Sequence, residues 1–371
     1  MMKKKIGVVF GTRPEAIKMA PVIKELEKYP DQYEILVIVT AQHREMLDQV
    51  LHVFDIHPTY DLNVMRPKQS LSDITVNVMK GLEEIFMDEK PDMVLVHGDT
   101  TTSFAAALAA YYQQIPIGHV EAGLRTYDKY FPFPEEANRQ LIDNLADLFF
   151  VPTELTKSNL LNENKLESEI VVTGNTAIDA IQYTKQLSVK HELLNTIQAY
   201  DKTILLTMHR RENHGEPMKQ VFKAIKRIVD EHEDVVVVMP VHLSPVVQEL
   251  AKDMLSGNER ILLSDPLEVD VFHKVLSKSY IVLTDSGGLQ EEAPAFDIPV
   301  LVLRDKTERP EGLTAGTLKV IGTDEEKVYQ SIEQLLNSQV IYDKMSRANN
   351  PYGDGIASVT IVERIQKYFI K

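Results

Sequence analysis

The chain has 371 residues, of which 44% are hydrophobic and 26% are charged, so it is long enough for two globular domains with a core each. It contains no cysteine, which excludes disulfides and thiolate metal sites and predicts a reducing compartment. The formal net charge of −15 argues against nucleic acid or an anionic membrane as the main partner, so cations that meet a phosphate ligand must be local.

The N-terminal segment predicts neither export nor membrane insertion. The basic MMKKK resembles the start of a signal peptide, but only IGVVF follows it before GTRPE, so the apolar core of a signal is missing. No apolar run reaches the ~18 residues of a membrane span. We therefore expect a cytoplasmic protein that does not bind membranes.

Short apolar runs rich in β-branched residues alternate with longer amphipathic segments. The runs are KIGVVF, EILVIVT, DMVLVHGD, IPIGHVEA, DLFFVPT and EIVVTG and, after the polar stretch 182–202, TILLTMH, DVVVVMP, RILLSD, YIVLTD and PVLVLR. Such runs are typical of buried parallel strands. Segments with helical spacing lie between them, at 15–29, 102–113, 135–147 and 216–232. The pattern predicts an α/β fold with two doubly wound parallel sheets and ligands at the carboxyl ends of the strands.

The first strand end, FGTRPEAIKMAP, has the features of an anion site. Gly11 ends the strand, and Pro14 suits the first turn of a helix. Backbone amides at a helix start favour an anion, and Arg13 and Lys18 add positive charge. The alternative is an ordinary strand–turn–helix connection with surface cations.

The loop TDSGGLQEEA at 284–293 repeats this pattern in the second half. Ser286, Gly287 and Gly288 are expected to form a turn whose amides can approach a phosphate closely. We expect Glu291 and Glu292 in the first turn of the helix that follows. Two interpretations stay open there: one acid receives ribose hydroxyls, or both only suit the helix dipole.

Acidic residues recur at strand ends and helix starts of the first half. Asp99 lies in HGDTTTS, Glu121 in GHVEAGLRT, and Glu135 and Glu136 in FPFPEEANRQ. The alternative for Asp99 is a helix cap. Because the ends of parallel strands meet at one rim, we expect these acids to form a cluster. Crowded carboxylates shift one another's pKa values, which suits general acid–base catalysis.

Cationic residues follow two strand runs of the second half. LLTMHRREN contains His209, Arg210 and Arg211, and LRDKTERPEG contains Arg304 and Arg309. A lone histidine is usually structural, but three such groups together favour contact with an anion. The sequence has no G-x-G-x-x-G after a strand, no Walker A loop, no G-x-S-x-G and no convincing metal-ligand spacing. We therefore expect neither a cofactor nor a metal ion.

Long segments of the chain resemble one enzyme family. FGTRPEAIKMAP, HGDTTTSFAAALAA, GHVEAGLRT, FPEEANRQLID, HRREN, TDSGGLQEEAPAF, RDKTERPEG and NPYGDG are similar to segments of the bacterial non-hydrolysing UDP-N-acetylglucosamine 2-epimerases. The resemblance runs from end to end. It implies a GT-B fold, with Rossmann-like domains over 1–175 and 176–353 facing across a cleft, and a helix over 354–371 packing back on the first domain. It also implies a cytoplasmic homodimer.

The resemblance implies an isomerase that interconverts UDP-GlcNAc and UDP-ManNAc and supplies ManNAc for surface polysaccharide. The C2 proton of the sugar is not acidic, because no carbonyl is adjacent. Transient oxidation would need NAD, for which no fingerprint is present. Elimination instead needs carboxylates near the sugar and fixed positive charge near the departing diphosphate, and the sequence offers both.

The resemblance also implies roles for individual residues. It assigns Asp99, Glu121 and Glu135 to proton transfer, without fixing which acts in each direction, and His209 to the leaving phosphate or the sugar. Contacts with UDP or the sugar fall to Arg13, Lys18, Phe272, Ser286, Gly287, Gly288, Glu292 and Arg309. Leu267 stands where some relatives carry a polar residue, so recognition of the base there is expected to use backbone atoms.

Bacterial members of the family bind a second UDP-GlcNAc as an allosteric activator. The residues that resemble this site are Gln42, His43, Arg44, Arg66, Glu136, Arg210 and His242. The alternative is that QHREMLDQV is only the polar start of a helix. Activation predicts a sigmoidal dependence of rate on UDP-GlcNAc, and a hyperbola would argue against it.

Three other functions remain as alternatives. A GT-B glycosyltransferase would need an acceptor, whereas an epimerase needs none. A hydrolysing epimerase would release free ManNAc and UDP. A sensor of UDP-sugars would bind without turnover, but it gains nothing from acids placed near a diphosphate.

Overall fold

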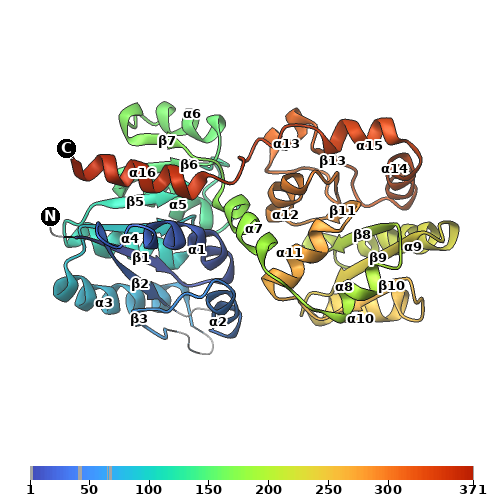
Figure 1. Ribbon diagram of the computed structural model, residues 1–371, viewed down its shortest axis with the longest axis horizontal. Helices are drawn as coiled ribbons and strands as arrows, with labels where there is room; N and C mark the ends of the chain where they lie inside the picture. Colours follow the sequence, from blue (N-terminus) through green and yellow to red (C-terminus); the bar gives the residue numbers. More distant parts are fainter. Residues whose placement is uncertain (1–2, 41–43, 65, 67–68, 371) are drawn as a thin grey trace. The chain divides into compact units, whose positions relative to one another are not determined.

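The computed structural model describes residues 3–40, 44–64, 66 and 69–370, and the chain divides into two compact units. The first unit comprises Met1–Ala180 and Tyr352–Lys371, and the second comprises Ile181–Pro351. The sequence predicts domain boundaries after residues 175 and 353, and the compact units divide after residues 180 and 351. Figure 1 shows each unit with its own sheet and helices.

The described part of the first unit contains a seven-stranded parallel sheet in the order β3-β2-β1-β4-β5-β6-β7. The strands are β1 Lys4–Phe10, β2 Tyr33–Val39, β3 Tyr60–Asp61, β4 Met93–His97, β5 Ile117–Val120, β6 Leu148–Val151 and β7 Ile170–Val172. The helices are α1 Arg13–Glu27, α2 Arg44–Val53, α3 Leu71–Glu89, α4 Thr101–Tyr112, α5 Glu135–Leu145, α6 Glu154–Asn162, η1 Glu167–Glu169 and α16 Ala357–Ile370. Helix α7, Thr176–Gln186, begins in the first unit and ends in the second. From β1, strands β2 and β3 extend the sheet in one direction and β4 to β7 extend it in the other, so the switch point lies between β1 and β4. Doubly wound sheets bind ligands at such a switch point.

The described residues of the second unit form a six-stranded parallel sheet in the order β10-β9-β8-β11-β12-β13. Its strands are β8 Lys202–Thr207, β9 Val235–Pro240, β10 Ile261–Ser264, β11 Ile281–Thr284, β12 Val300–Val302 and β13 Leu318–Val320. Its helices are α8 Glu192–Ile197, η2 Arg211–Asn213, α9 Glu216–Glu231, α10 Pro245–Leu255, α11 Val269–Ser277, α12 Gly287–Glu292, η3 Ala293–Phe296, α13 Pro310–Ala315, α14 Glu325–Asn337 and α15 Gln339–Ser346. The switch point here lies between β8 and β11.

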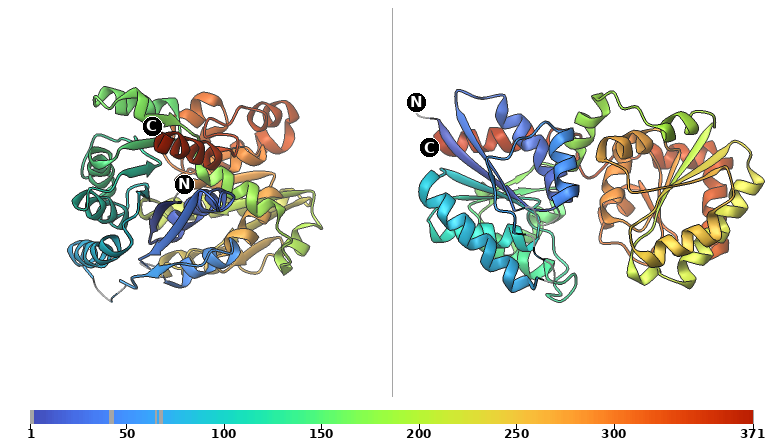
Figure 2. Two further views of the ribbon diagram at one scale, coloured as in Figure 1. Left: turned by 60° about the vertical axis from the view of Figure 1, so that its left-hand side comes forward. Right: turned by 90° about the horizontal axis from the view of Figure 1, so that it is seen from below.

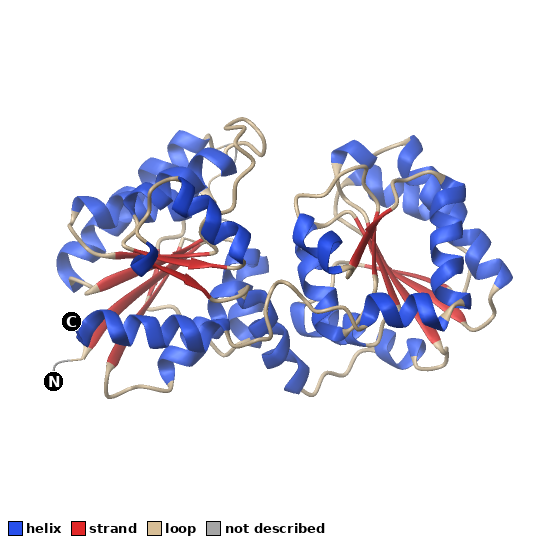
Figure 3. Ribbon diagram, turned by 90° about the horizontal axis from the view of Figure 1, so that it is seen from above, coloured by secondary structure: helices blue, strands red, loops and turns tan. Residues whose placement is uncertain are grey.

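Helices cover both faces of each sheet (Figure 3). In the first unit, α3 and α4 enclose a large apolar core with strands β1, β2, β4 and β5. In the second unit, one core lies under α9, α10 and α14, and a second lies under α8 and α11 on the other face. Because helices bury both faces of each sheet, the strand segments are continuous apolar runs. The arrangement confirms the predicted α/β fold with two doubly wound parallel sheets.

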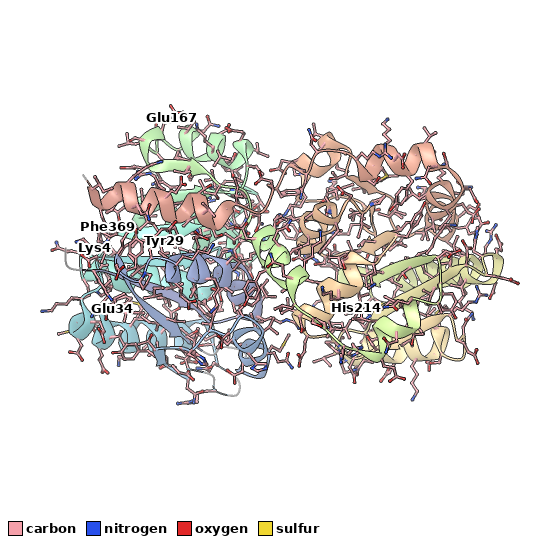
Figure 4. All side chains as sticks on the ribbon, in the orientation of Figure 1. Lys4, Tyr29, Glu34, Glu167, His214 and Phe369 are labelled. Carbon is pink, nitrogen blue, oxygen red and sulfur yellow. The ribbon has the colours of Figure 1, made fainter. Side chains whose placement is uncertain are left out.

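The last helix, α16, packs against α1 of the first unit (Figure 2). Asp179 of α7 accepts hydrogen bonds from the amides of Ala357 and Ser358 at 3.1 and 2.7 Å, so it caps this helix from a distant part of the chain. At the other end, the Lys4 ammonium lies 5.1 Å from the centre of the Phe369 ring, and Figure 4 labels both residues. Within the described residues, no helix is long and apolar enough to cross a membrane.

Candidate functional site

The predicted site residues of the first unit lie just beyond the carboxyl ends of neighbouring strands. Arg13 follows β1, Asp99 follows β4 and Glu121 follows β5, while Glu135 begins α5. Strands β1, β4 and β5 are adjacent in the sheet. The sheet therefore brings three of the expected segments to the rim beside its switch point.

A buried acid that the sequence reasoning did not select organises the β1–α1 turn. Glu15, only 2% exposed, accepts hydrogen bonds from the amides of Gly11 and Thr12 at 3.0 and 2.7 Å. It also accepts from the hydroxyls of Thr100 and Ser103 at 2.6 and 2.8 Å, so it joins the loops after β1 and β4. The expectation that backbone amides of this turn receive an anion is therefore wrong for Gly11 and Thr12.

The turn also leaves no space for a side chain at its glycine. A Cβ atom at Gly11 would lie 2.1 Å from Oγ1 of Thr40 and 2.8 Å from Oγ1 of Thr102. Glycine is needed here because the two threonines close over the backbone. This packing fixes the point at which Arg13 enters the first turn of α1.

Lys18 and Glu121 form an ion pair at the rim of the first sheet. The Glu121 carboxylate also accepts a hydrogen bond from Nδ2 of Asn175 at 3.0 Å and lies 3.7 Å from Nε2 of His97. Burial alone would raise the pKa of Glu121, but the charges of Lys18 and His97 hold it well below its usual value of 4.5. Glu121 is therefore ionised and is a weak proton acceptor while Lys18 stays beside it.

This ion pair predicts a pH-dependent contribution to stability. A carboxylate whose folded pKa is depressed stabilises the fold above its unfolded pKa, near 4.5, and the contribution is lost as the pH falls below that value. We expect Glu121→Gln to have a lower thermal midpoint than wild type at pH 7. The difference between the two midpoints should become smaller as the pH falls below about 4.5. Thermal denaturation of both proteins across this range measures the effect. A difference independent of pH would contradict it.

Asp99 does not cap a helix. The cap of α4 is Thr100, whose side chain accepts from the amide of Ser103, so the capping alternative for Asp99 is wrong. The carboxylate of Asp99 instead accepts from Arg139 at 2.5 Å, and its carbonyl accepts from Nδ2 of Asn138 at 2.9 Å. Asp99 is thus held from α5, with a quarter of its side chain exposed.

The neighbouring acids at the start of α5 have different environments. Glu136 is fully buried, and its oxygens accept from the amides of Thr126 and Tyr127, each at 3.0 Å. Glu135 is half-buried, and its side chain has no hydrogen bond or ion pair to any residue that the structure describes. Glu135 is therefore available for a ligand, whereas Glu136 holds the loop before α5.

A buried acid also organises the histidine loop of the second unit. Asp285, directly after β11, accepts from the amides of His209 and Arg210 at 3.0 Å each and from Nδ2 of Asn213 at 2.9 Å. Its other oxygen lies 3.2 Å from Nδ1 of His209. Sequence reasoning did not select Asp285, although it follows a strand as Asp99 does.

The His209 ring is held as a neutral group. Burial lowers its pKa from 6.5, and the charges of Arg210 and His242 act in the same direction, while Asp285 opposes them. Because Nδ1 lies 3.2 Å from a carboxylate oxygen of Asp285, this contact favours the tautomer with the ring hydrogen on Nδ1, in which Nε2 can accept a proton. The His242 ring stacks on it with a centroid separation of 5.6 Å.

Of the predicted Ser-Gly-Gly turn, Ser286 is the N-cap of a short helix, α12, and Gly287 and Gly288 are the first two residues of that helix. Glu291 and Glu292 are the last two residues of this helix, so the expectation that they lie in its first turn is wrong. Glu291 forms an ion pair with Arg309, and Glu292 lies 3.9 Å from Nε2 of His273. The helix dipole therefore does not explain these acids.

The remaining predicted residues lie in several places. In the second unit, Phe272 and Leu267 pack on the core under α11, and Arg210 donates to Glu308 at 3.2 Å. In the first unit, Arg44 begins α2, and Nη1 of Arg66 donates to the carbonyl of Asn63 at 3.2 Å. Gln42 and His43 lie outside the described residues. Across the described chain, no group of three acids or histidines has the geometry to hold a metal ion.

Comparison with known proteins gives consistent results. The family model described as UDP-N-acetylglucosamine 2-epimerase matches residues 24–366. The UDP-N-acetylglucosamine 2-epimerase of Bacillus subtilis is 60% identical, over 98% of this chain and 96% of its own. The crystal structure of the Neisseria meningitidis UDP-GlcNAc 2-epimerase bound to UDP-GlcNAc is 50% identical, covers 98% of this chain and 100% of that one, and superposes with a TM-score of 0.89. The Methanocaldococcus jannaschii enzyme in complex with UDP-GlcNAc and UDP is 34% identical, covers 98% and 99%, and has a TM-score of 0.80.

Proposed function

Because this chain belongs to the UDP-N-acetylglucosamine 2-epimerase family and is an epimerase, we propose that it interconverts UDP-GlcNAc and UDP-ManNAc by eliminating UDP and adding it back. A base takes the C2 proton while the bond from C1 to the UDP oxygen breaks, which leaves 2-acetamidoglucal and UDP. UDP then adds back to C1 as a proton is delivered to the other face of C2. The sequence carries no dinucleotide fingerprint, which favours elimination over transient oxidation.

The observation that carries this proposal is the set of acids and cations at one rim of the first sheet. Asp99, Glu121 and Glu135 would carry out proton transfer, and Arg13 and Lys18 would meet the departing diphosphate. The environments suggest different roles. Asp99 and Glu135 are the better candidates for moving protons, since Glu121 is already paired with Lys18 and has a depressed pKa.

The second unit would hold the nucleotide. We assign the diphosphate to Ser286, Gly287, Gly288 and Arg309, the ribose to Glu292 and the base to Phe272. A neutral His209 with its Nε2 unprotonated would accept a hydrogen bond from the sugar, or donate one to the leaving phosphate once it takes up a proton. The relatives from Neisseria meningitidis and Methanocaldococcus jannaschii, whose structures contain UDP-GlcNAc, support the choice of substrate.

We also propose the wider roles that the family resemblance implies. A second UDP-GlcNAc would activate the enzyme, and stacking of His242 on His209 would join its site to the catalytic histidine. The chain would act in the cytoplasm as a homodimer and supply ManNAc for surface polysaccharide. Exposed apolar side chains on α3 and α4 support an association surface; they are Val76, Met87, Tyr111 and Tyr112.

The proposal is tested by incubating the protein with UDP-GlcNAc alone in D₂O and following the sugar by proton NMR. We expect UDP-ManNAc to appear with deuterium at C2, because the proton removed at C2 exchanges with solvent before another is delivered. If UDP-ManNAc instead keeps the original hydrogen at C2, the C2 proton is not removed by a base that exchanges its proton with solvent. Free ManNAc and UDP in equal amounts would identify a hydrolysing enzyme instead.

A further inference from the structure

A buried ion network lies next to the loops that carry Asp99 and Glu121. Nδ1 of His119, in β5, is 2.6 Å from Oδ1 of Asp143, in α5. The second carboxylate oxygen of Asp143 is 2.7 Å from the guanidinium of Arg125. All three side chains are completely buried, although none of them is assigned a part in the proposed reaction.

The partners of His119 determine which atoms carry hydrogen. Its Nε2 is 2.7 Å from the carbonyl oxygen of Gly98, which can only accept. Burial alone would raise the pKa of Asp143, but His119 and Arg125 lower it below 3.8, so this carboxylate is ionised and also accepts. Both contacts can therefore form as hydrogen bonds only if both ring nitrogens donate, as they do in the charged imidazolium.

These contacts reach the two strand-end loops of the candidate site. Gly98 has a φ of +62°, and its peptide bond leads directly to Asp99. The amide of Gly123, two residues after Glu121, donates to Asp143 at 3.3 Å. A single buried carboxylate on α5 is thus connected to the segment of Asp99 through His119 and to the segment of Glu121 through Gly123.

Helix α5 presents a row of such contacts at helical spacing. Asn138 bonds the carbonyl of Asp99, Arg139 bonds its carboxylate, and Asp143 supports His119 one turn later. The same helix begins with Glu135, a candidate for proton transfer. Side chains three and four residues apart lie on one helix face, so α5 holds one acid in place while carrying another.

We propose that His119 is a positioning residue for the epimerase reaction: its charged ring, anchored by Asp143, fixes the carbonyl of Gly98 and thereby the position of Asp99. This inference rests on the proposed role of Asp99 in proton transfer. Charge on the ring strengthens both hydrogen bonds, and burial prevents water from replacing either partner. His119 itself does not touch substrate in this account.

Two substitutions separate the two hydrogen bonds of the ring. In His119→Asn the side-chain amide nitrogen takes the place of Nδ1, so the contact with Asp143 can persist while the contact with Gly98 is lost. In His119→Gln the amide nitrogen reaches toward the place of Nε2, so the contact with Gly98 can persist while Asp143 loses a charged partner. We expect kcat to fall ~10 to 100-fold in His119→Asn with little change in KM, because a displaced acid slows the reaction without weakening binding.

The same comparison distinguishes positioning from a purely structural role. We expect His119→Gln to have the lower thermal midpoint but to keep more of kcat per folded molecule than His119→Asn. If kcat instead follows the thermal midpoint, or stays at the wild-type value in both folded variants, the inference is overturned. Nitrogen-15 NMR of the histidine rings in wild-type protein gives a check that needs no variant, since a neutral His119 ring would also overturn it.

A double variant tests whether His119 acts through Asp99. In an Asp99→Asn background, His119→Asn should lower the residual rate no further, because the acid that it positions is already gone. An equal fold-loss in both backgrounds would show that His119 acts elsewhere. Near-normal turnover of Asp99→Asn alone would instead overturn the proposed role of Asp99, and this inference with it, so the two failures are distinguishable.

Discussion

Asp99→Asn is expected to lose ~10² to 10⁴-fold in kcat while it continues to bind UDP, since positioned acid–base groups contribute that much to a rate. The substitution removes the ability to take or give a proton but preserves size and shape. An asparagine oxygen can still accept from Arg139, and the bond from Asn138 reaches the backbone carbonyl, which is unchanged. The variant should therefore fold normally, and its loss should lie in the chemical step.

Three measurements on Asp99→Asn make this prediction specific: the rate of UDP-ManNAc formation, the rate of deuterium entry at C2 and the affinity for UDP by calorimetry. Asp88→Asn is a suitable control, because Asp88 is an exposed residue of α3 in the same unit and its side chain makes no hydrogen bond or ion pair within the described chain. Asp88→Asn should behave as wild type. If Asp99→Asn epimerises at close to the wild-type rate, Asp99 does not take part in proton transfer.

Most of the fold could be predicted from the sequence, because buried parallel strands appear in it as continuous apolar runs. All eleven predicted strands are present. Among the described residues, the two strands that were not predicted are the edge strands β3 and β13. Strand β3 has only two residues, and β13 contains the exposed Lys319. Neither produces an apolar run, so hydrophobic patterning could not identify them.

The positions of the candidate acids could be predicted from topology, but their partners could not. Reading Asp99 and Glu121 as strand-end residues requires only the order of local segments. The contacts of Lys18 with Glu121 and of Asp285 with His209 join residues 103 and 76 positions apart, and no local pattern encodes them. The capping box of Thr12 and Glu15 is a local signal that could have identified Glu15.

Glu15 and Asp285 have equivalent structural roles in the two units. Each is a buried carboxylate that accepts backbone amides of a loop at the switch point of its sheet. Glu15 joins the loops after β1 and β4, and Asp285 joins those after β8 and β11. A loop whose amides are bound by a buried acid has little freedom, so side chains that it carries are held ready for a ligand.

The second large effect is expected for Asp285→Ala, which should lose both stability and turnover. The substitution leaves the amides of His209 and Arg210 without their acceptor, and Nδ2 of Asn213 with only the carbonyl of Leu303. Unsatisfied buried donors of this kind make a loss of about 3 kcal/mol in the free energy of unfolding reasonable. For a unit of this size, that corresponds to a fall of roughly 6 to 12 °C in its thermal midpoint.

His209→Asn is the matched comparison, because it removes the ring and leaves the loop backbone bound to Asp285. We expect it to lose turnover with little change in the thermal midpoint, since its side chain is 37% exposed. Asp253→Ala, at an exposed position of α10 where the side chain has no described partner, should change neither quantity. If Asp285→Ala retains the wild-type midpoint, the loop is held by other contacts. If it loses stability but keeps full turnover per folded molecule, then the position of His209 does not limit the reaction.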